Sequence, residues 1–127
     1  MSFSEVPPVA LQLNQGCLVA TLQFANDARV LERFRFDLLE RLKTSEARAV
    51  VIDLSSIDLI DAAEFEHLRH TVEMATLLGA SVVLVGIRAG VAAALVELPV
   101  DLRGINTALD LQAATQWLEG VRLRRNG

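Results

Sequence analysis

Two short runs of apolar, largely β-branched residues constrain the fold of this chain more than any other feature of its sequence. One reads ARAVVIDL (Ala47–Leu54) and the other reads SVVLVGI (Ser81–Ile87). Runs of this length and composition are typical of strands that are buried on both faces of a sheet. Because a helical pattern separates them, the two strands are expected to lie parallel, as they do in an α/β domain.

The segment between the two runs has the period of an amphipathic helix. Asp61 is a suitable cap for its start, and Gly79 is a suitable stop. Apolar residues between them recur at every third or fourth position, which places them on one face of the helix. This stripe consists of Phe65, Leu68, Val72, Ala75 and Leu78.

The chain before these runs predicts a β-hairpin and a first helix. Strands are expected at Val9–Leu13 and Cys17–Phe24, and the turn sequence NQG joins them too tightly for any arrangement but an antiparallel pair. Asn26 and Asp27 are candidate caps for a helix that runs to about Lys43. Its apolar stripe consists of Leu31, Phe34, Leu38 and Leu42.

The chain after the second run predicts three further elements. They are a short helix that ends near Pro99, a short edge strand within GINTA (Gly104–Ala108) and a last helix from Asp110 to Val121. The residues expected to face inward are Val91, Leu95 and Leu98 in the short helix, and Leu111, Ala114, Leu118 and Val121 in the last one. The final residues, 122–127, are expected to form a flexible, solvated tail.

The composition is that of one ordered domain. The chain has 127 residues, of which 52% are hydrophobic and 22% are charged, and a chain of this kind can bury a core of its own. No repeat or linker divides it, so residues 1–127 are expected to form a single domain with its core at about 8–118. The element order predicts an opening hairpin, then alternating strands and helices, in a mixed and mostly parallel sheet with helices packed on it.

Charge and hydropathy exclude several classes of function. The net charge is −4 and the basic residues are scattered, whereas a general nucleic-acid binder carries a basic face. No apolar run reaches the roughly 18 residues that a membrane span needs, and the N-terminus lacks the pattern of a secretory signal. A cytoplasmic protein is therefore expected, in which the single Cys17 is a buried and inert thiol.

No metal or cofactor site is expected. His67 and His70 are close in sequence on the predicted second helix, near Glu64, Glu66 and Glu73, but HLRH is not the HExxH motif of zinc proteases. These residues are interpreted as a solvated helix face. The glycines of VGIRAGVA match neither a GxGxxG nor a Walker pattern, which excludes a phosphate-binding loop.

The carboxyl end of the central strand is where an α/β domain usually places its working residues. Asp53 ends this strand, as the phospho-accepting aspartate does in a response-regulator receiver, but the acidic pair and the late lysine of a receiver are missing. Ser55 and Ser56 follow without a histidine near them in sequence. Ala62 and Ala63 then occupy the start of the predicted second helix, where they can do no chemistry. The chain is therefore not expected to be an enzyme.

Three segments resemble the STAS domain family, whose name denotes sulfate transporter and anti-sigma factor antagonist. They are AVVIDLSSIDLIDAAEF, LLGASVVLVGIRAGVAAALVEL and INTALDLQAATQWL. The resemblance extends from about Pro8 to Leu118 and is greatest to RsbS-type proteins, the small single-domain subunits of bacterial stressosomes. The family fold has the element order predicted above.

The resemblance implies a non-enzymatic scaffold in a partner-switching stress pathway. Stressosome subunits of this type pack into large cages with sensor paralogues that carry a similar C-terminal domain. The cage captures a serine/threonine kinase of the anti-sigma type, and phosphorylation of the STAS domains releases that kinase. The family's acceptor hydroxyl maps to Ala62, directly after Asp61, and a second acceptor of the sensor paralogues maps near Ala94. The implied partner-binding residues are Ser55, Ser56, Ile57, Asp58, Asp61, Ala62 and Ala63.

Ala62 departs from the family pattern, because the small subunit usually has a serine there. Either the chain is a natural homologue that cannot be phosphorylated at this position, or it is a Ser-to-Ala variant held in the unphosphorylated state. The alternative role is that of a plain anti-anti-sigma factor, which binds one anti-sigma kinase without forming a cage. Smaller departures occur at Ala89-Gly90, where relatives often have Pro and an acid, and at Pro99, where Gly is frequent.

Overall fold

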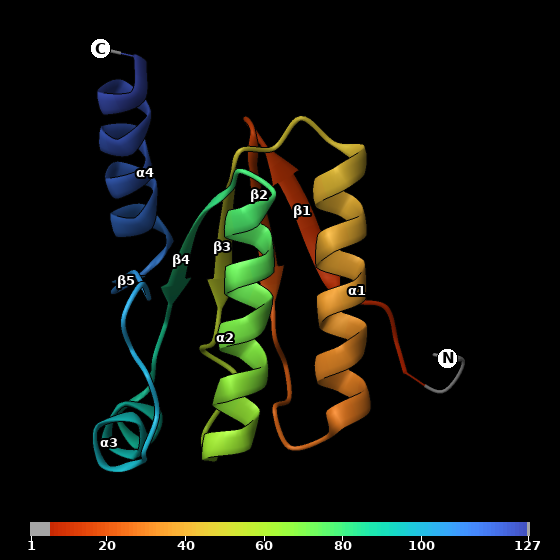
Figure 1. The fold of residues 1–127 in the computed structure, drawn as a ribbon, viewed down its shortest axis with the longest axis vertical. Coiled ribbons are helices and arrows are strands. Elements are labelled where there is room, and N and C mark those ends of the chain that lie inside the picture. The colour runs from red at the N-terminus through yellow and green to blue at the C-terminus, as the bar shows by residue number, and fades with distance from the viewer. Residues whose placement is uncertain (1–5, 127) are drawn as a thin grey trace.

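The computed structural model describes residues 6–126, which form a five-stranded sheet and four helices (Figure 1). The strands are β1 (Ala10–Asn14), β2 (Cys17–Thr21), β3 (Ala49–Asp53), β4 (Ser81–Val85) and β5 (Thr107–Ala108), and the helices are α1 (Ala28–Thr44), α2 (Ala62–Leu77), α3 (Ala89–Glu97) and α4 (Leu111–Asn126). α1, α2 and α4 pack on the faces of the sheet, and α3 lies beyond the lower end of the strands (Figure 1). The strands lie in chain order across the sheet; β1 is antiparallel to β2, and the other neighbouring pairs are parallel. The predicted α/β class, hairpin and mostly parallel sheet are confirmed.

α1 and α2 lie side by side and cover one face of the sheet (Figure 1). Each begins at an aspartate cap, Asp27 for α1 and Asp61 for α2, as predicted. Each turns its apolar stripe toward the strand residues on that face, so that helices and sheet share one continuous core. The buried stripes are Leu31, Phe34, Leu38 and Leu42 of α1, and Phe65, Leu68, Val72 and Ala75 of α2.

Leu78 does not follow the predicted stripe of α2. The helix ends at Leu77, and Leu78 takes a backbone conformation of φ −82° and ψ 4° before Gly79 turns the chain at a φ of 96°. Because Leu78 has left the helix, its side chain is half exposed, at 50%. Gly79 does stop the helix, as predicted, since glycine adopts a positive φ without a steric penalty.

α4 lies on the opposite face of the sheet from α1 and α2, and β3 and β4 separate it from them (Figure 1). Of its residues predicted to face inward, Ala114 is buried and Leu118 and Val121 are partly buried. Leu111 is 46% exposed, contrary to the prediction, because it begins the helix at the edge of a surface groove. None of the helices in the described part of the chain is long and apolar enough to cross a membrane.

The expected tail at residues 122–127 is helical as far as Asn126, and Gly127 lies outside the described residues. No glycine or proline interrupts this segment before Gly127, so α4 has no reason to stop at Val121. Arginines also suit this end of the helix, because cations interact favourably with the carboxyl end of the helix dipole. An ion pair between Arg122 and Glu119 (2.8 Å) spans the predicted boundary.

Cys17 is partly buried rather than fully buried as predicted. Its side chain lies on the α4 side of β2, whereas α4 packs chiefly on β3, β4 and β5. The partial burial raises the pKa of the thiol, which keeps it protonated and weakly nucleophilic.

Candidate functional site

The carboxyl ends of β2, β3 and β4 meet at one edge of the sheet, the lower edge in Figure 1, and the loops that follow these strands lie there together. The β3–α2 loop, residues 54–61, is the central one. The predicted partner-binding residues all lie in this loop or in the first turn of the helix that follows it. In parallel α/β sheets this edge is the usual place for function.

One hydrogen bond and two buried isoleucines hold the β3–α2 loop. The Asp53 carboxylate accepts a hydrogen bond from the backbone N–H of Ser55 (2.9 Å), which turns the chain as it leaves β3. Ile57 and Ile60 are buried beneath the loop. Ile57, one of the predicted binding residues, therefore anchors the loop to the core, while the loop's serines and Asp58 are exposed.

α2 begins with a complete capping box. The Asp61 carboxylate accepts a hydrogen bond from the N–H of Glu64 (2.7 Å), and the Glu64 carboxylate accepts one from the N–H of Asp61 (2.9 Å). Ala62, the first residue of the helix, is partly buried, and Ala63 is exposed. A side chain at position 62 thus stands in a firmly held first turn, where the helix dipole favours an anion.

The start of α3 packs closely against the same loop. Arg88 forms an ion pair with Asp58, and a Cβ atom on Gly90 would lie 3.0 Å from the Asp58 carbonyl oxygen. The departure from the family pattern at Gly90 therefore coincides with a close approach of two backbone segments. Ala94, where the sensor paralogues have their second acceptor, is partly buried on this helix.

A groove of about 470 Å³ separates the β3–α2 loop from the β2–α1 loop. Phe24 and Leu59 line it from the two loops, and they are 57% and 76% exposed. Because both side chains line the same groove, they give it apolar area that is available for contact with another protein. The sequence did not single out either residue as a site residue, because Phe24 falls at the end of a predicted strand and Leu59 belongs to no apolar stripe.

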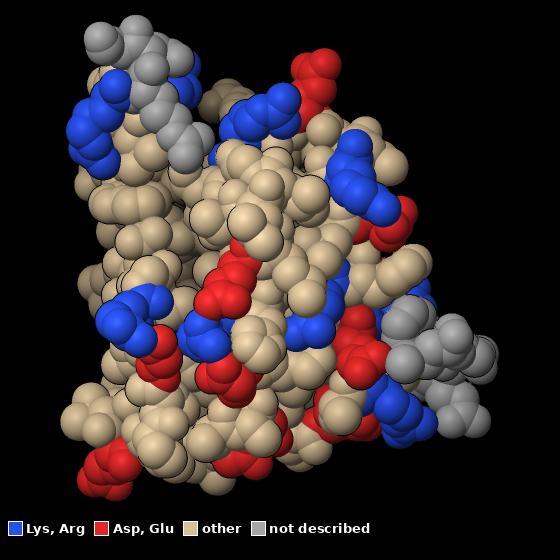
Figure 2. Space-filling view, in the orientation of Figure 1, with Lys and Arg blue, Asp and Glu red and all other residues tan. Residues whose placement is uncertain are grey.

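The charged groups that line this groove are acidic. Asp58 and Asp61 are exposed, and Glu64 is partly exposed. Arg88, at the start of α3, forms an ion pair with Asp58. Figure 2 shows acidic side chains along the lower edge of the molecule, where these loops lie. A protein that docks here has to neutralise these carboxylates or leave them in solvent.

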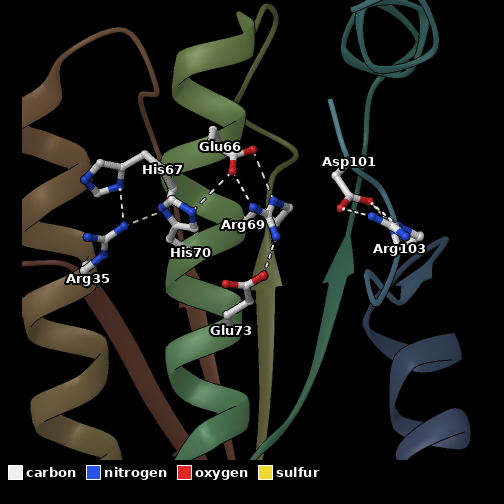
Figure 3. Close-up of polar contacts among 8 residues, drawn as sticks. All are labelled: Arg35, Glu66, His67, Arg69, His70, Glu73, Asp101 and Arg103. Atoms are coloured by element: carbon white, nitrogen blue, oxygen red, sulfur yellow. Dashed lines mark hydrogen bonds and ion pairs between the residues drawn. The ribbon is translucent and has the colours of Figure 1, made fainter. Parts of the chain in front are cut away.

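The two histidines of α2 have different neighbours (Figure 3). The Arg35 guanidinium joins α1 to α2: it lies 3.3 Å from Nδ1 of His67 and donates hydrogen bonds to the His67 carbonyl (2.8 Å) and to the Thr71 hydroxyl (2.9 Å). Burial, and next the charge of Arg35, lower the pKa of His67. His70 lies beside Glu66, with 3.3 Å between Nε2 and Oε1.

Ion pairs cover the outer face of α2 and the loop that follows α3 (Figure 3). Arg69 pairs with both Glu66 and Glu73, and its hydrogen bond lowers the pKa of Glu66. Hydrogen bonds from Arg103 lower the pKa of Asp101 to about 2. Within residues 6–126 no three His, Cys, Asp or Glu side chains are grouped as metal ligands would be; the carboxylates here face arginines instead.

The chain is similar to known proteins at the level of sequence. It matches the family model described as the STAS domain over residues 8–114. The RsbT co-antagonist protein RsbRA of Bacillus subtilis (strain 168) is 29% identical over 109 residues, which are 86% of this chain and 38% of that protein. The chain therefore spans about two fifths of the length of this relative.

Two solved structures are similar over almost their whole length. A serine-to-glutamate variant of RsbS from Moorella thermoacetica has a TM-score of 0.76 at 29% identity, and the match covers 90% of this chain and 97% of that one. A chain from a structure that describes the molecular architecture of the stressosome, a signal integration and transduction hub, has a TM-score of 0.73 at 27% identity and covers 89% and 98%.

Proposed function

The chain belongs to the STAS domain family, and we propose that it is a non-enzymatic scaffold of a stressosome-type assembly, which captures a serine/threonine kinase of the anti-sigma type through the β3–α2 loop. Its similarity to RsbS and RsbRA supports a partner-switching role. The proposed assembly partners are sensor paralogues with a C-terminal STAS domain, and the proposed location is the cytoplasm.

The exposed β3–α2 loop is the observation that carries this proposal. Buried isoleucines hold the loop from below, and the capping box holds the start of the helix. Above them Phe24 and Leu59 offer apolar area on either side of an open groove. A firmly held surface with exposed apolar side chains favours docking of a protein, because little conformational entropy is lost when the partner binds.

Position 62 is the proposed switch of this surface. A phosphorylated side chain there would add about −1.5 to −2 charges at neutral pH, and the first turn of α2 tolerates an anion, so the fold would survive. The same group would have to be accommodated within an interface that fits a methyl group, where an unpaired anion is costly. Ala62 has no hydroxyl, and the proposed switch therefore stays in the state that captures the kinase.

Phosphorylation of matched serine variants tests the proposal. The unaltered chain and Ala62→Ser are incubated with the cognate kinase and labelled ATP, with Ala63→Ser as the control because it adds the same hydroxyl one residue later. We expect label on Ala62→Ser and none on the other two proteins. Stoichiometric labelling of the unaltered chain, or equal labelling of both serine variants, would show that position 62 is not the acceptor site.

A further inference from the structure

The segment that leaves β4 lies against the β3–α2 loop at two glycines. Gly86 follows β4 at a φ of 71°, and a Cβ atom on it would lie 3.0 Å both from Oδ1 of Asp53 and from the Cβ atom of Ser55. Gly90 lies in the first turn of α3, and a Cβ atom on it would lie 3.0 Å from the Asp58 carbonyl oxygen. Both ends of this segment therefore approach the loop more closely than a Cβ atom fits without a displacement.

The two glycines differ in what requires them. At Gly86 the positive φ alone would strain any other residue. Gly90 belongs to a helix, whose backbone conformation every residue adopts, and glycine is less favourable than alanine in such a position. Only the approach of the Asp58 carbonyl disfavours a side chain there. The contact with the loop, and not the helix, is therefore what glycine serves at position 90.

The loop and α3 also share buried apolar contacts beneath this surface. Ile57 and Ile60 of the loop and Val91 and Leu95 of α3 are buried in one core. α3 has nine residues and no side-chain hydrogen bond at its N-cap, Arg88. The ion pair of Arg88 with the loop leaves both side chains more than half exposed, and such pairs contribute little to stability. Packing, rather than charge, therefore sets how closely the loop and the helix lie.

We propose that Gly90 is a positioning residue of the docking surface that the β3–α2 loop and its groove form. Because Gly90 has no side chain, Asp58 comes to rest against α3, and the next residue, Leu59, is held at the groove opposite Phe24. A Cβ atom at position 90 would displace Asp58 by a few tenths of an ångström, and Leu59 would move with it because a planar peptide joins the two residues. The position of the loop follows from packing alone, whereas its effect on kinase binding rests on the function proposed above.

A series of side chains at position 90 tests the position of the loop. Gly90→Ala and Gly90→Val add one and three carbon atoms; Gly120→Ala and Gly120→Val make the same changes in α4, where a Cβ atom would meet only the end of the Arg124 side chain, at 3.4 Å. Hydrogen exchange is followed at the amides of Ser55 and Ile57, which are hydrogen-bonded at the start of the loop, and is compared with that of β3 amides, which report global unfolding.

We expect the loop amides to exchange about threefold faster in Gly90→Ala and about tenfold faster in Gly90→Val, relative to those of β3. The Gly120 variants are expected to stay within about twofold of the unaltered chain. Unchanged loop exchange in both Gly90 variants, or faster exchange that is confined to α3, overturns the proposal.

The kinase affinity of the same four variants extends the test to docking. We expect binding to weaken about threefold in Gly90→Ala and about tenfold in Gly90→Val, and by less than about twofold in the Gly120 variants. Faster loop exchange with unchanged kinase affinity would overturn the role of Gly90 in docking. Failure of the unaltered chain to bind the kinase would instead overturn the proposed function, and the exchange of the loop would still decide whether Gly90 positions it.

Discussion

The two faces of the sheet differ in how completely the chain covers them. Under α1 and α2, strand residues such as Leu18 and Val50 have no exposed surface (0%). On the other face, Ala114 is the only buried residue among those of α4 whose burial the structure describes, and burial fades from Val83 to Val19. Apolar area that the chain has already buried cannot be buried again against a partner, whereas half-covered area can. The difference teaches that the α1–α2 face is a closed core, whereas the α4 face keeps apolar area that the chain covers only in part.

Matched valine truncations give the largest expected contrast between the faces. Val50→Ala removes buried methyl groups on the α1–α2 face and is expected to lower the free energy of unfolding by about 2–3 kcal/mol, since a cavity remains. Val19→Ala makes the same change in the neighbouring strand on the α4 face, and its expected cost is below about 1 kcal/mol because Val19 is only partly buried. Chemical denaturation measures both. Equal losses for Val50→Ala and Val19→Ala would show that the α4 face is as closed as the other.

A smaller effect on stability is expected from a change of pH, through His67, which lies between α1 and α2. The pKa of His67 is lowered in the folded protein by burial and by Arg35; Glu32 of α1 opposes this shift, and His70 on the same helix adds to it. The folded state therefore binds fewer protons than the unfolded chain, whose histidines have a pKa of about 6.5. Stability is then complete above that value, and it falls as the pH drops through about 6.5, levelling off below the lowered pKa of the folded state.

Unfolding free energies measured from roughly pH 8 to pH 5.5 test this expectation, a range in which histidine is the main titrating side chain. His67→Gln should abolish most of the dependence, whereas the control His70→Gln, on the exposed side of α2, should retain it. A flat profile for the unaltered protein would mean that folding does not lower the pKa of His67.

The smallest expected effect on stability is that of a substitution in the β3–α2 loop, at the carboxyl ends of the parallel strands. Leu59 is 76% exposed, so Leu59→Ala should change the free energy of unfolding by less than about 0.5 kcal/mol. The same change should weaken kinase binding by about tenfold or more, if Leu59 is a contact of the docking surface. Leu77→Ala, at an 87% exposed position at the other end of α2, is the matched control. Equal kinase affinities for the two variants in a titration would remove Leu59 from the docking surface.

Much of the fold could be predicted because its signals are local. The turn after Asn14, the caps at Asp27 and Asp61 and the stop at Gly79 all depend on residues within one helical turn of the feature they set. The predicted end of α4 at Val121 was wrong, because no glycine or proline follows Val121 to stop the helix there. The place of the β3–α2 loop at the carboxyl ends of the parallel strands was also predictable, since it follows from the order of strands and helices.

The sequence by itself determined the elements, their order and the alanine at position 62, because periodicity, capping and side-chain identity are properties of neighbouring residues. Only the tertiary structure decided which side chains are exposed. Phe24 and Leu59 are as apolar as the residues of the core. Cys17 belongs to a strand whose other residues are also largely apolar. What differs is whether a distant part of the chain covers them, and that depends on where the helices lie. α1 and α2 close one face of the sheet, whereas α4 packs chiefly over β3, β4 and β5 and leaves a groove beside β2 on the other face.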